Sequence, residues 1–196
     1  MRARRLAAGL AAVVLGLAGP ARAQEISLSL AAGSVFAADA AYRQVYGGSG
    51  LALEGNIWFK LKVPLGVAVG LGRLADDGFA VPMDGGEEEY PVEFRRTSVP
   101  LVVFYQVGGK AIDVRFGAGL GIHSYRESWE TVDLVHEGHK VSFRLVLAAT
   151  YALLDRLSLL CSVSYDSIRT GAGSPLAENA DVGGVQLLGG LSFRIF

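Results

Sequence analysis

The stretch 111–126, AIDVRFGAGLGIHSYR, repeats every two residues over almost its whole length. Apolar side chains at every second position alternate with charged residues, glycines and a histidine. Because successive side chains of a strand point to opposite faces, the pattern predicts a β-strand. The apolar positions are Ile112, Val114, Phe116, Ala118, Leu120 and Ile122, and the alternate positions are Asp113, Arg115, Gly117, Gly119, Gly121 and His123.

The second face of this strand is unusual because Asp113 and Arg115 share it with three glycines. Such a face must be crowded enough to need small residues and polar enough to hold charges. A surface strand of a soluble sandwich would place polar residues of ordinary size in water. The inward face of a narrow membrane barrel fits better, with the apolar face turned to lipid.

The N-terminus predicts an export signal. It begins MRARR, continues with the apolar run 6–19, and ends in the small-x-small sequence Ala21, Arg22, Ala23. The run is shorter than the roughly 20 residues that a spanning helix needs, which disfavours an uncleaved anchor. We therefore expect a cleaved signal peptide at 1–23 and one outer-membrane β-barrel domain at 24–196.

Composition supports a barrel. The chain is 51% apolar, yet after residue 24 no apolar run approaches the length of a spanning helix. Barrel strands need only about 10 residues to cross and hide every second residue from lipid. The net charge of −1 argues against a nucleic-acid partner. The single cysteine, Cys161, excludes an internal disulfide and a cysteine metal site.

Similar alternation predicts seven further strands, which lie at 26–36, 51–61, 65–73, 92–107, 141–153, 157–167 and 184–196. The connections alternate in length: 37–50, 75–91, 127–139 and 169–183 are long and polar, whereas 62–64, 108–110 and 154–156 are short. Outer-membrane barrels have long loops outside and short turns in the periplasm. We therefore predict an all-β protein, an eight-stranded antiparallel transmembrane up-and-down β-barrel.

The strand at 92–107 contains two adjacent arginines, Arg95 and Arg96, of which one must point outward. An arginine at the lipid midplane costs roughly 2–4 kcal/mol but almost nothing at the interface. We therefore expect the pair at the barrel rim.

Three segments resemble the OmpA-like and OmpW-like outer-membrane β-barrel superfamily: FAADAAYRQVYGGSG at 36–50, GAGLGIHSY at 117–125 and LSFRIF at 191–196. The resemblance covers the whole mature chain and implies eight antiparallel strands in the bacterial outer membrane. It also implies that the aromatic last residue, Phe196, is an assembly signal read by the barrel-assembly machinery. Phe196 is out of phase with Phe193 and Ile195, so either a bulge restores its phase or Ile195 is the lipid-facing end.

The polar face carries nearly balanced charges. An eight-stranded barrel encloses little more than its own side chains, and an unpaired buried charge is costly. We therefore expect a lumen charge network that plugs the barrel, with a gated ion path along the same residues as the alternative. The network residues are Glu54, Lys60, Asp113, Arg115, Arg144, Asp166 and Arg194.

Two groups of residues are candidates for a chemical site. His123 and Ser124, with Glu127 and Glu130, suggest a lipid A deacylase, but adjacent strand residues face opposite sides and cannot easily share a proton. The loop segment 136–139, with His136, Glu137 and His139, could hold a metal, but its spacing matches no established motif. We expect no catalytic residue, no metal and no cofactor.

These observations predict a monomeric, non-enzymatic barrel with outer-membrane lipid around it. Its role is structural or lies in surface interactions through four long loops, whose ligand the sequence does not name. The first alternative is a narrow channel for small or hydrophobic solutes, as in the OmpW-like branch. The second is an outer-membrane lipid-modifying hydrolase.

Overall fold

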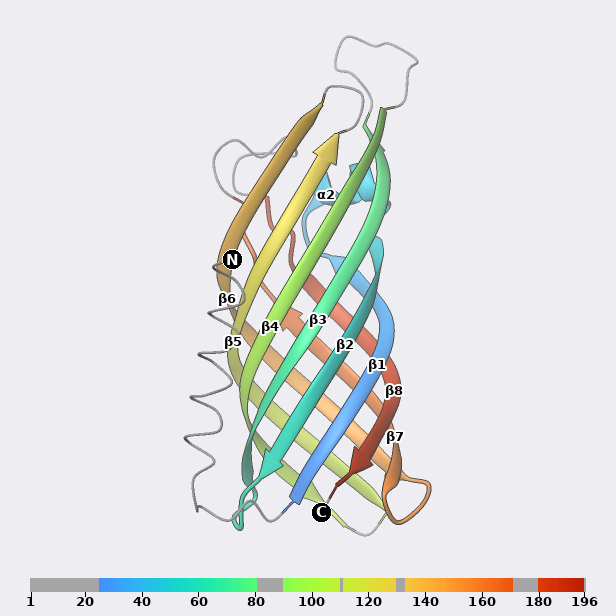
Figure 1. Cartoon of the computed structure of the whole chain (residues 1–196), viewed down its shortest axis with the longest axis vertical. Coiled ribbons are helices and arrows are strands. Elements are labelled where there is room, and N and C mark those ends of the chain that lie inside the picture. Colours follow the sequence, from blue (N-terminus) through green and yellow to red (C-terminus); the bar gives the residue numbers. More distant parts are fainter. Residues whose placement is uncertain (1–24, 81–89, 110, 130–132, 171–179, 196) are drawn as a thin grey trace.

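The chain forms one closed antiparallel barrel (Figure 1). The structure is a computed structural model, which describes residues 25–80, 90–109, 111–129, 133–170 and 180–195. Each strand pairs with the next, and the last pairs with the first. The strands are β1 (Glu25–Ala37), β2 (Ser49–Lys60), β3 (Leu65–Ala80), β4 (Tyr90–Gly108), β5 (Ile112–Trp129), β6 (Leu134–Ala152), β7 (Leu157–Asp166) and β8 (Gly184–Arg194). The predicted fold class is confirmed. The predicted signal peptide lies outside the described residues.

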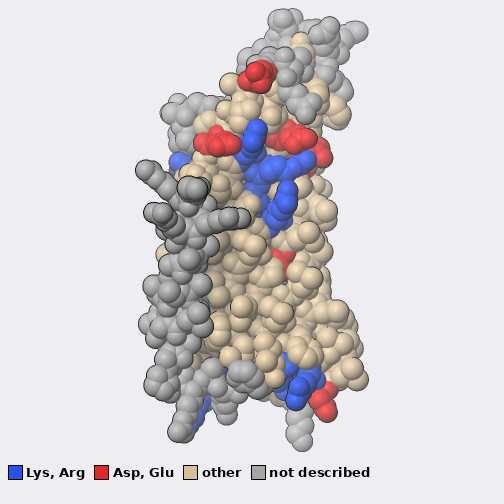
Figure 2. Space-filling model, in the orientation of Figure 1, with Lys and Arg blue, Asp and Glu red and all other residues tan. Residues whose placement is uncertain are grey.

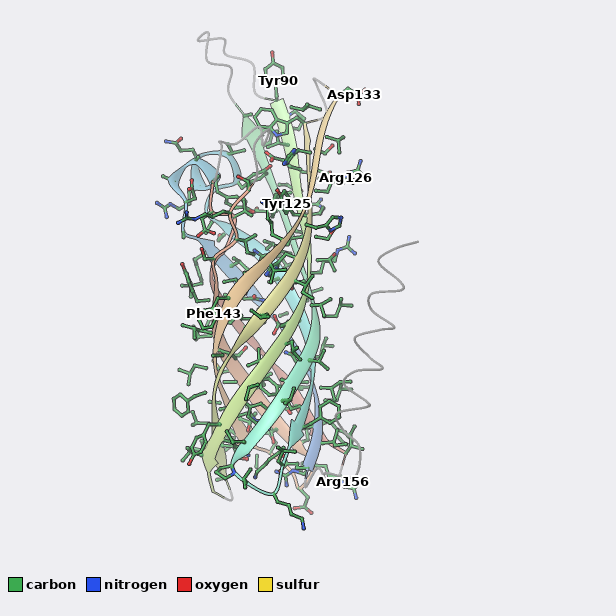
Figure 3. The ribbon with its side chains drawn as sticks, turned by 90° about the vertical axis from the view of Figure 1, so that its left-hand side faces the viewer. Tyr90, Tyr125, Arg126, Asp133, Phe143 and Arg156 are labelled. Atoms are coloured by element: carbon green, nitrogen blue, oxygen red, sulfur yellow. The ribbon has the colours of Figure 1, made fainter. Side chains whose placement is uncertain are left out.

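The predicted orientation of the two strand faces is also correct. In β5, Phe116 and Leu120 are 53% and 51% exposed, whereas Arg115 is 4% exposed inside the barrel. Figure 3 shows Phe143, also on the apolar face, projecting from the outer wall at mid-height. The oily side chains therefore form the outer wall and the polar ones line the lumen. Among the described residues, no helix combines the length and the apolarity needed to cross a membrane.

Two predicted loops are shorter than expected because strands continue through them. Both ends of the acidic segment predicted at 75–91 belong to strands, since β3 runs to Ala80 and β4 begins at Tyr90, while 81–89 lie outside the described residues. Most residues of the predicted loop 127–139 belong to paired strands, since β5 ends at Trp129 and β6 starts at Leu134. Polar residues here mark strand extensions into water rather than turns. Figure 1 shows β3, β4, β5 and β6 rising above the rest of the barrel.

The predicted loop 37–50 contains a helix, α2 (Ala40–Tyr46). Asp39 caps its N-terminus by accepting a 2.8 Å hydrogen bond from the Ala41 N–H. Gly47 ends it in the left-handed conformation, at φ 75°, and its N–H donates to the Arg43 carbonyl. Figure 1 shows α2 in the upper part of the barrel. We call this end the loop end and the opposite end the turn end.

Of the two adjacent arginines one points outward, as predicted, and the other, Arg96, points into the barrel. Its side chain is inside, 5% exposed, and donates to the Val182 carbonyl at 2.9 Å. Arg95 points outward and contacts Asp77 at 2.6 Å. Because the Val182 carbonyl accepts from Arg96 inside the lumen, inward and outward side chains continue to alternate along β4 at this pair.

The C-terminal strand is shorter than the predicted 184–196, since β8 ends at Arg194. Ile195 is 43% exposed, on the outer wall with Phe193, and its N–H donates to the Ile26 carbonyl at 2.8 Å. Of the two alternatives, this favours Ile195 as the lipid-facing end. Phe196 lies outside the described residues, so its role as an assembly signal stays a prediction.

One place in the wall has interrupted pairing. Between β3 and β4 the register runs from Val69 opposite Leu101 to Gly72 opposite Ser98, with no pair between them. Pro100, which has no N–H to donate, lies in this gap.

The glycines of β5 allow β4 to approach closely. A Cβ at Gly119 would meet the Leu101 carbonyl oxygen and the Val102 Cα, which are backbone atoms that cannot swing aside. At Gly55 the nearest atom to such a Cβ would be the Ser29 carbonyl oxygen, at 3.7 Å, an ordinary contact.

We therefore predict that Gly119→Ala lowers the free energy of unfolding by about 1–3 kcal/mol, the usual cost of overpacking. Gly55→Ala should change it far less. Urea unfolding in lipid vesicles, followed by heat-modifiable migration on gels, measures both. Equal stability of the two variants would contradict the close approach.

Candidate functional site: the lumen and its mouth

Arg144 on β6 lies at the centre of a buried charge network. Its Nη2 is 2.5 Å from Glu54 Oε2 on β2 and 3.0 Å from Ser164 Oγ, and its Nη1 is 3.2 Å from Asp166 Oδ2 on β7. The side chains of Arg144, Glu54 and Asp166 are 2%, 7% and 3% exposed. One cation therefore joins two acids from opposite parts of the wall. We call these three residues the central network.

His123 and Ser142 extend this network. Ser142 Oγ is 2.8 Å from His123 Nε2 and donates to Asp166 Oδ1 at 3.1 Å. The group is not a catalytic triad, because in a triad the acid orients the imidazole through its other nitrogen. Here Asp166 Oδ1 lies 3.8 Å from the same Nε2 that meets the serine, and Nδ1 is buried without a partner. The arrangement positions Asp166 rather than activating Ser142.

Arg115 occupies a separate level nearer the turn end. Its guanidinium carbon lies 4.7 Å from the centre of the Trp58 ring and 5.7 Å from that of Phe104. Its Nε donates to Gln106 at 3.3 Å, while Nη1 is buried without a partner. The two rings thus take the place of a carboxylate and fill the lumen around the cation.

Three of the seven predicted network residues therefore come together. Arg115 is apart from them. Lys60 and Asp113 are half-buried near the turn end, where Arg194, 46% exposed, pairs with Glu25 at 3.2 Å. His123 and Ser142 are network residues that were not predicted, although the strand alternation places both on the polar face.

Aromatic side chains close the lumen at the loop end. Tyr42 and Tyr46 of α2 pack on Phe94, with ring centres 5.3 and 5.8 Å away, and Phe94 lies 6.2 Å from Tyr125. All four are at most 4% exposed. Figure 3 shows Tyr125 near the loop end, above the level of Phe143. We call these four residues the mouth cluster.

Hydrogen bonds fix α2 over the mouth. The Tyr42 hydroxyl donates to Asp76 at 3.1 Å, and the Tyr46 hydroxyl donates to Glu127 at 3.4 Å. Burial, reinforced by Asp76, raises the pKa of Tyr42 well above its ordinary value, so the hydroxyl stays a donor at neutral pH. Trp129 adds a 2.8 Å bond to Glu127. The helix α2 therefore closes the lumen from inside and is hydrogen-bonded to β3 and β5.

The N-cap Asp39 also joins α2 to the segment before β8. Its Oδ2 accepts from the Asp181 N–H at 3.3 Å, and its Oδ1 accepts from Ala41. Burial alone would raise the pKa of Asp39, but these backbone donors and Arg43 bring it below its ordinary value. The charged carboxylate therefore stabilises the loop end.

The residues considered for other chemistry are not brought together. His123 faces the lumen, whereas Ser124 is exposed on the other face, and Glu130 lies outside the described residues. His136 and His139 belong to β6 rather than to a loop, which corrects the prediction. His136 contacts Tyr125 in the lumen, while His139 is exposed on the outer wall.

Comparison with known proteins gives similarity at the level of structure. No family model matches the chain, and neither does any curated protein sequence. The outer membrane protein OprG of Pseudomonas aeruginosa is similar with a TM-score of 0.70 and 14% identity, over 89% of this chain and 97% of that one. Neisserial surface protein A, NspA, gives 0.59 and 13%, over 86% and 96%. Ail of Yersinia pestis, in complex with the heparin analogue sucrose octasulfate, gives 0.53 and 13%, over 87% and 97%.

The fold shared with these proteins and the apolar outer wall lead to one conclusion. The chain has the fold of the eight-stranded outer-membrane β-barrels. The resemblance predicted from the sequence is thus confirmed at the level of the fold.

We predict that Glu54→Gln lowers the free energy of unfolding of the barrel by about 3 kcal/mol, because it leaves a buried arginine with one acid instead of two. Glu137→Gln is the matched control, since Glu137 and Arg126 form an exposed pair 3.7 Å apart. That change should cost less than about 1 kcal/mol. Urea unfolding of folded barrel in vesicles measures both, and similar values would argue against a tightly paired lumen.

The lowered pKa of Asp39 gives a pH dependence. An aspartate ordinarily titrates near pH 3.9, so the contribution of its charge is fully present above that value. It is lost as the pH falls through the lower value of the folded barrel. We predict that the α2 amides exchange faster relative to their intrinsic rate at each pH, so that their protection factors fall, as the solution is acidified in this range. In Asp39→Asn, which keeps a capping side chain but no charge, this acceleration should disappear; its persistence would assign the effect to another group.

Proposed function

We propose that this barrel does not conduct and acts as a rigid membrane anchor that presents its loop end for surface contacts. The observation that carries the proposal is the filled lumen. From the turn end upward the interior holds Arg115 between aromatic rings, then the central network, then the mouth cluster.

The central network opposes conduction energetically. An ion or a file of water passing this level must separate Arg144 from Glu54 or Asp166. Breaking a buried pair typically costs 3–5 kcal/mol, because the remaining charge has lost its partner. The Arg144–Glu54 pair also spans the lumen between β6 and β2, which stiffens the wall.

The mouth cluster adds a second barrier and shapes the presented surface. Tyr42 and Tyr46 are held by bonds to β3 and β5, so α2 does not hang freely above the mouth. Two of the similar structures are a surface protein and a protein named for attachment and invasion. Their names support a surface role for a barrel of this shape, and the ligand is left to experiment.

The second candidate is a narrow path for small or hydrophobic solutes. The observation that favours it is the interrupted pairing between β3 and β4 beside Pro100. A wall with fewer hydrogen bonds at one level opens more easily toward the membrane than one with a continuous ladder.

We predict that the purified barrel gives no stable unitary conductance in planar bilayers at neutral pH. Stable steps that change on neutralising Arg115 or Arg144 would overturn the proposal in favour of a channel. Uptake of an apolar dye into vesicles, without conductance, would instead support the second candidate. An empty-vesicle preparation carried through the same detergent steps controls for leakage.

A further inference from the structure

Three arginines gather on the outer wall at the loop end. Arg73 on β3, Arg95 on β4 and Arg126 on β5 all lie on the outward face of their strands. The register places Arg95 directly opposite Arg126, and Arg73 opposite Thr97, two residues along β4 from Arg95. Three neighbouring strands thus build one patch, which we call the outer basic cluster. Figure 2 shows basic side chains gathered at this height on the outer wall.

The cluster lies at the edge of the apolar wall. The row of outward residues directly below it, toward the turn end, is entirely apolar, and so is the row below that. Figure 2 shows the corresponding wide band almost free of charge beneath the basic group. The two rows are Leu71, Val99, Ile122 and Val141, and then Val69, Leu101, Leu120 and Phe143. This height corresponds to the boundary between lipid chains and lipid headgroups.

Acidic residues lie in the upper row of the cluster and in the row above it, away from lipid. Glu137 stands directly opposite Arg126 and contacts it at 3.7 Å. Arg95 contacts Asp77 at 2.6 Å and Glu93 at 3.3 Å, and the register places both acids one row higher. For Arg73, the described part of the chain contains no carboxylate within ion-pair distance. Each guanidinium has five N–H donors, and exposed ion pairs are weak. Donors therefore remain available toward the membrane.

Polar groups between the arginines complete the surface. Thr97 and Ser124 lie opposite each other in the register between β4 and β5, in the same row as Arg73 and His139. All four are exposed on the outer wall. Hydroxyl and guanidinium donors side by side suit the oxygens of a phosphate, which arginine can bind with two parallel hydrogen bonds.

We propose that the outer basic cluster binds the phosphorylated headgroup of an outer-leaflet glycolipid of the lipid A type, whose acyl chains lie along the apolar rows below. The patch faces sideways at the membrane boundary, so a lipid reaches both surfaces at once. A soluble anion would interact with the arginines but not with the apolar rows. The binding site is on the wall and does not depend on whether the lumen conducts.

The test is lipid retention by the whole barrel. Folded protein in detergent is incubated with bisphosphorylated lipid A, passed through gel filtration and analysed for bound lipid by native mass spectrometry. The variant Arg73→Gln/Arg95→Gln/Arg126→Gln should retain at least tenfold less lipid than the unaltered barrel. Dephosphorylated lipid A should be retained as weakly by the unaltered barrel as lipid A is by the variant.

A matched control removes positive charge from the turn end. Arg156, which Figure 3 shows at the end of the molecule opposite Arg126, is replaced in Arg156→Gln together with Lys62→Gln. This control should retain lipid A like the unaltered barrel, and heat-modifiable migration verifies that all proteins are folded. Equal retention by the triple variant, equal retention of dephosphorylated lipid, or preferential capture of a soluble polyphosphate would each overturn the proposal.

Discussion

The need to pair every backbone N–H and C=O group inside hydrocarbon governs this molecule. Water cannot satisfy those groups in lipid, so the sheet must close on itself, and β8 returns to β1. Closure with eight strands leaves a lumen only wide enough for side chains. The polar face of every strand is therefore confined to that narrow space. The buried ion pairs and the close-packed glycines both follow from this confinement.

Inside the lumen, charge is balanced locally rather than across the whole interior. Arg144 has two acids within reach, Arg96 has the Val182 carbonyl, and Arg115 lies between aromatic rings. Each solution compensates a cation in surroundings where an unpaired charge is costly. Different levels of one barrel thus use a carboxylate, a backbone dipole and a π-face for the same purpose.

The sequence was sufficient for the fold because alternation alone separates the two faces of a strand, as in the segment around Phe116. It was not sufficient for the strand ends. Asp76 and Glu127 look like loop residues, yet they point into the mouth, where tyrosine hydroxyls donate to them. The helix α2 is too short for periodicity to reveal, and its stability comes from packing and from Asp39. Alternation places Glu54 and Asp166 inside, but which acid meets Arg144 depends on register and shear, which no single strand encodes.

Strand length is uneven around the circumference: β4 and β6 have 19 residues each, whereas β7 has 10 and β8 has 11. At about 3.3 Å per residue and a tilt near 45°, one flank stands roughly 20 Å taller than the other. A protein that diffuses in the plane of the bilayer therefore meets long strands when it approaches one flank and short strands when it approaches the other. The two flanks of the barrel therefore present different heights of wall above the membrane, and contacts made sideways within the bilayer differ from one flank to the other.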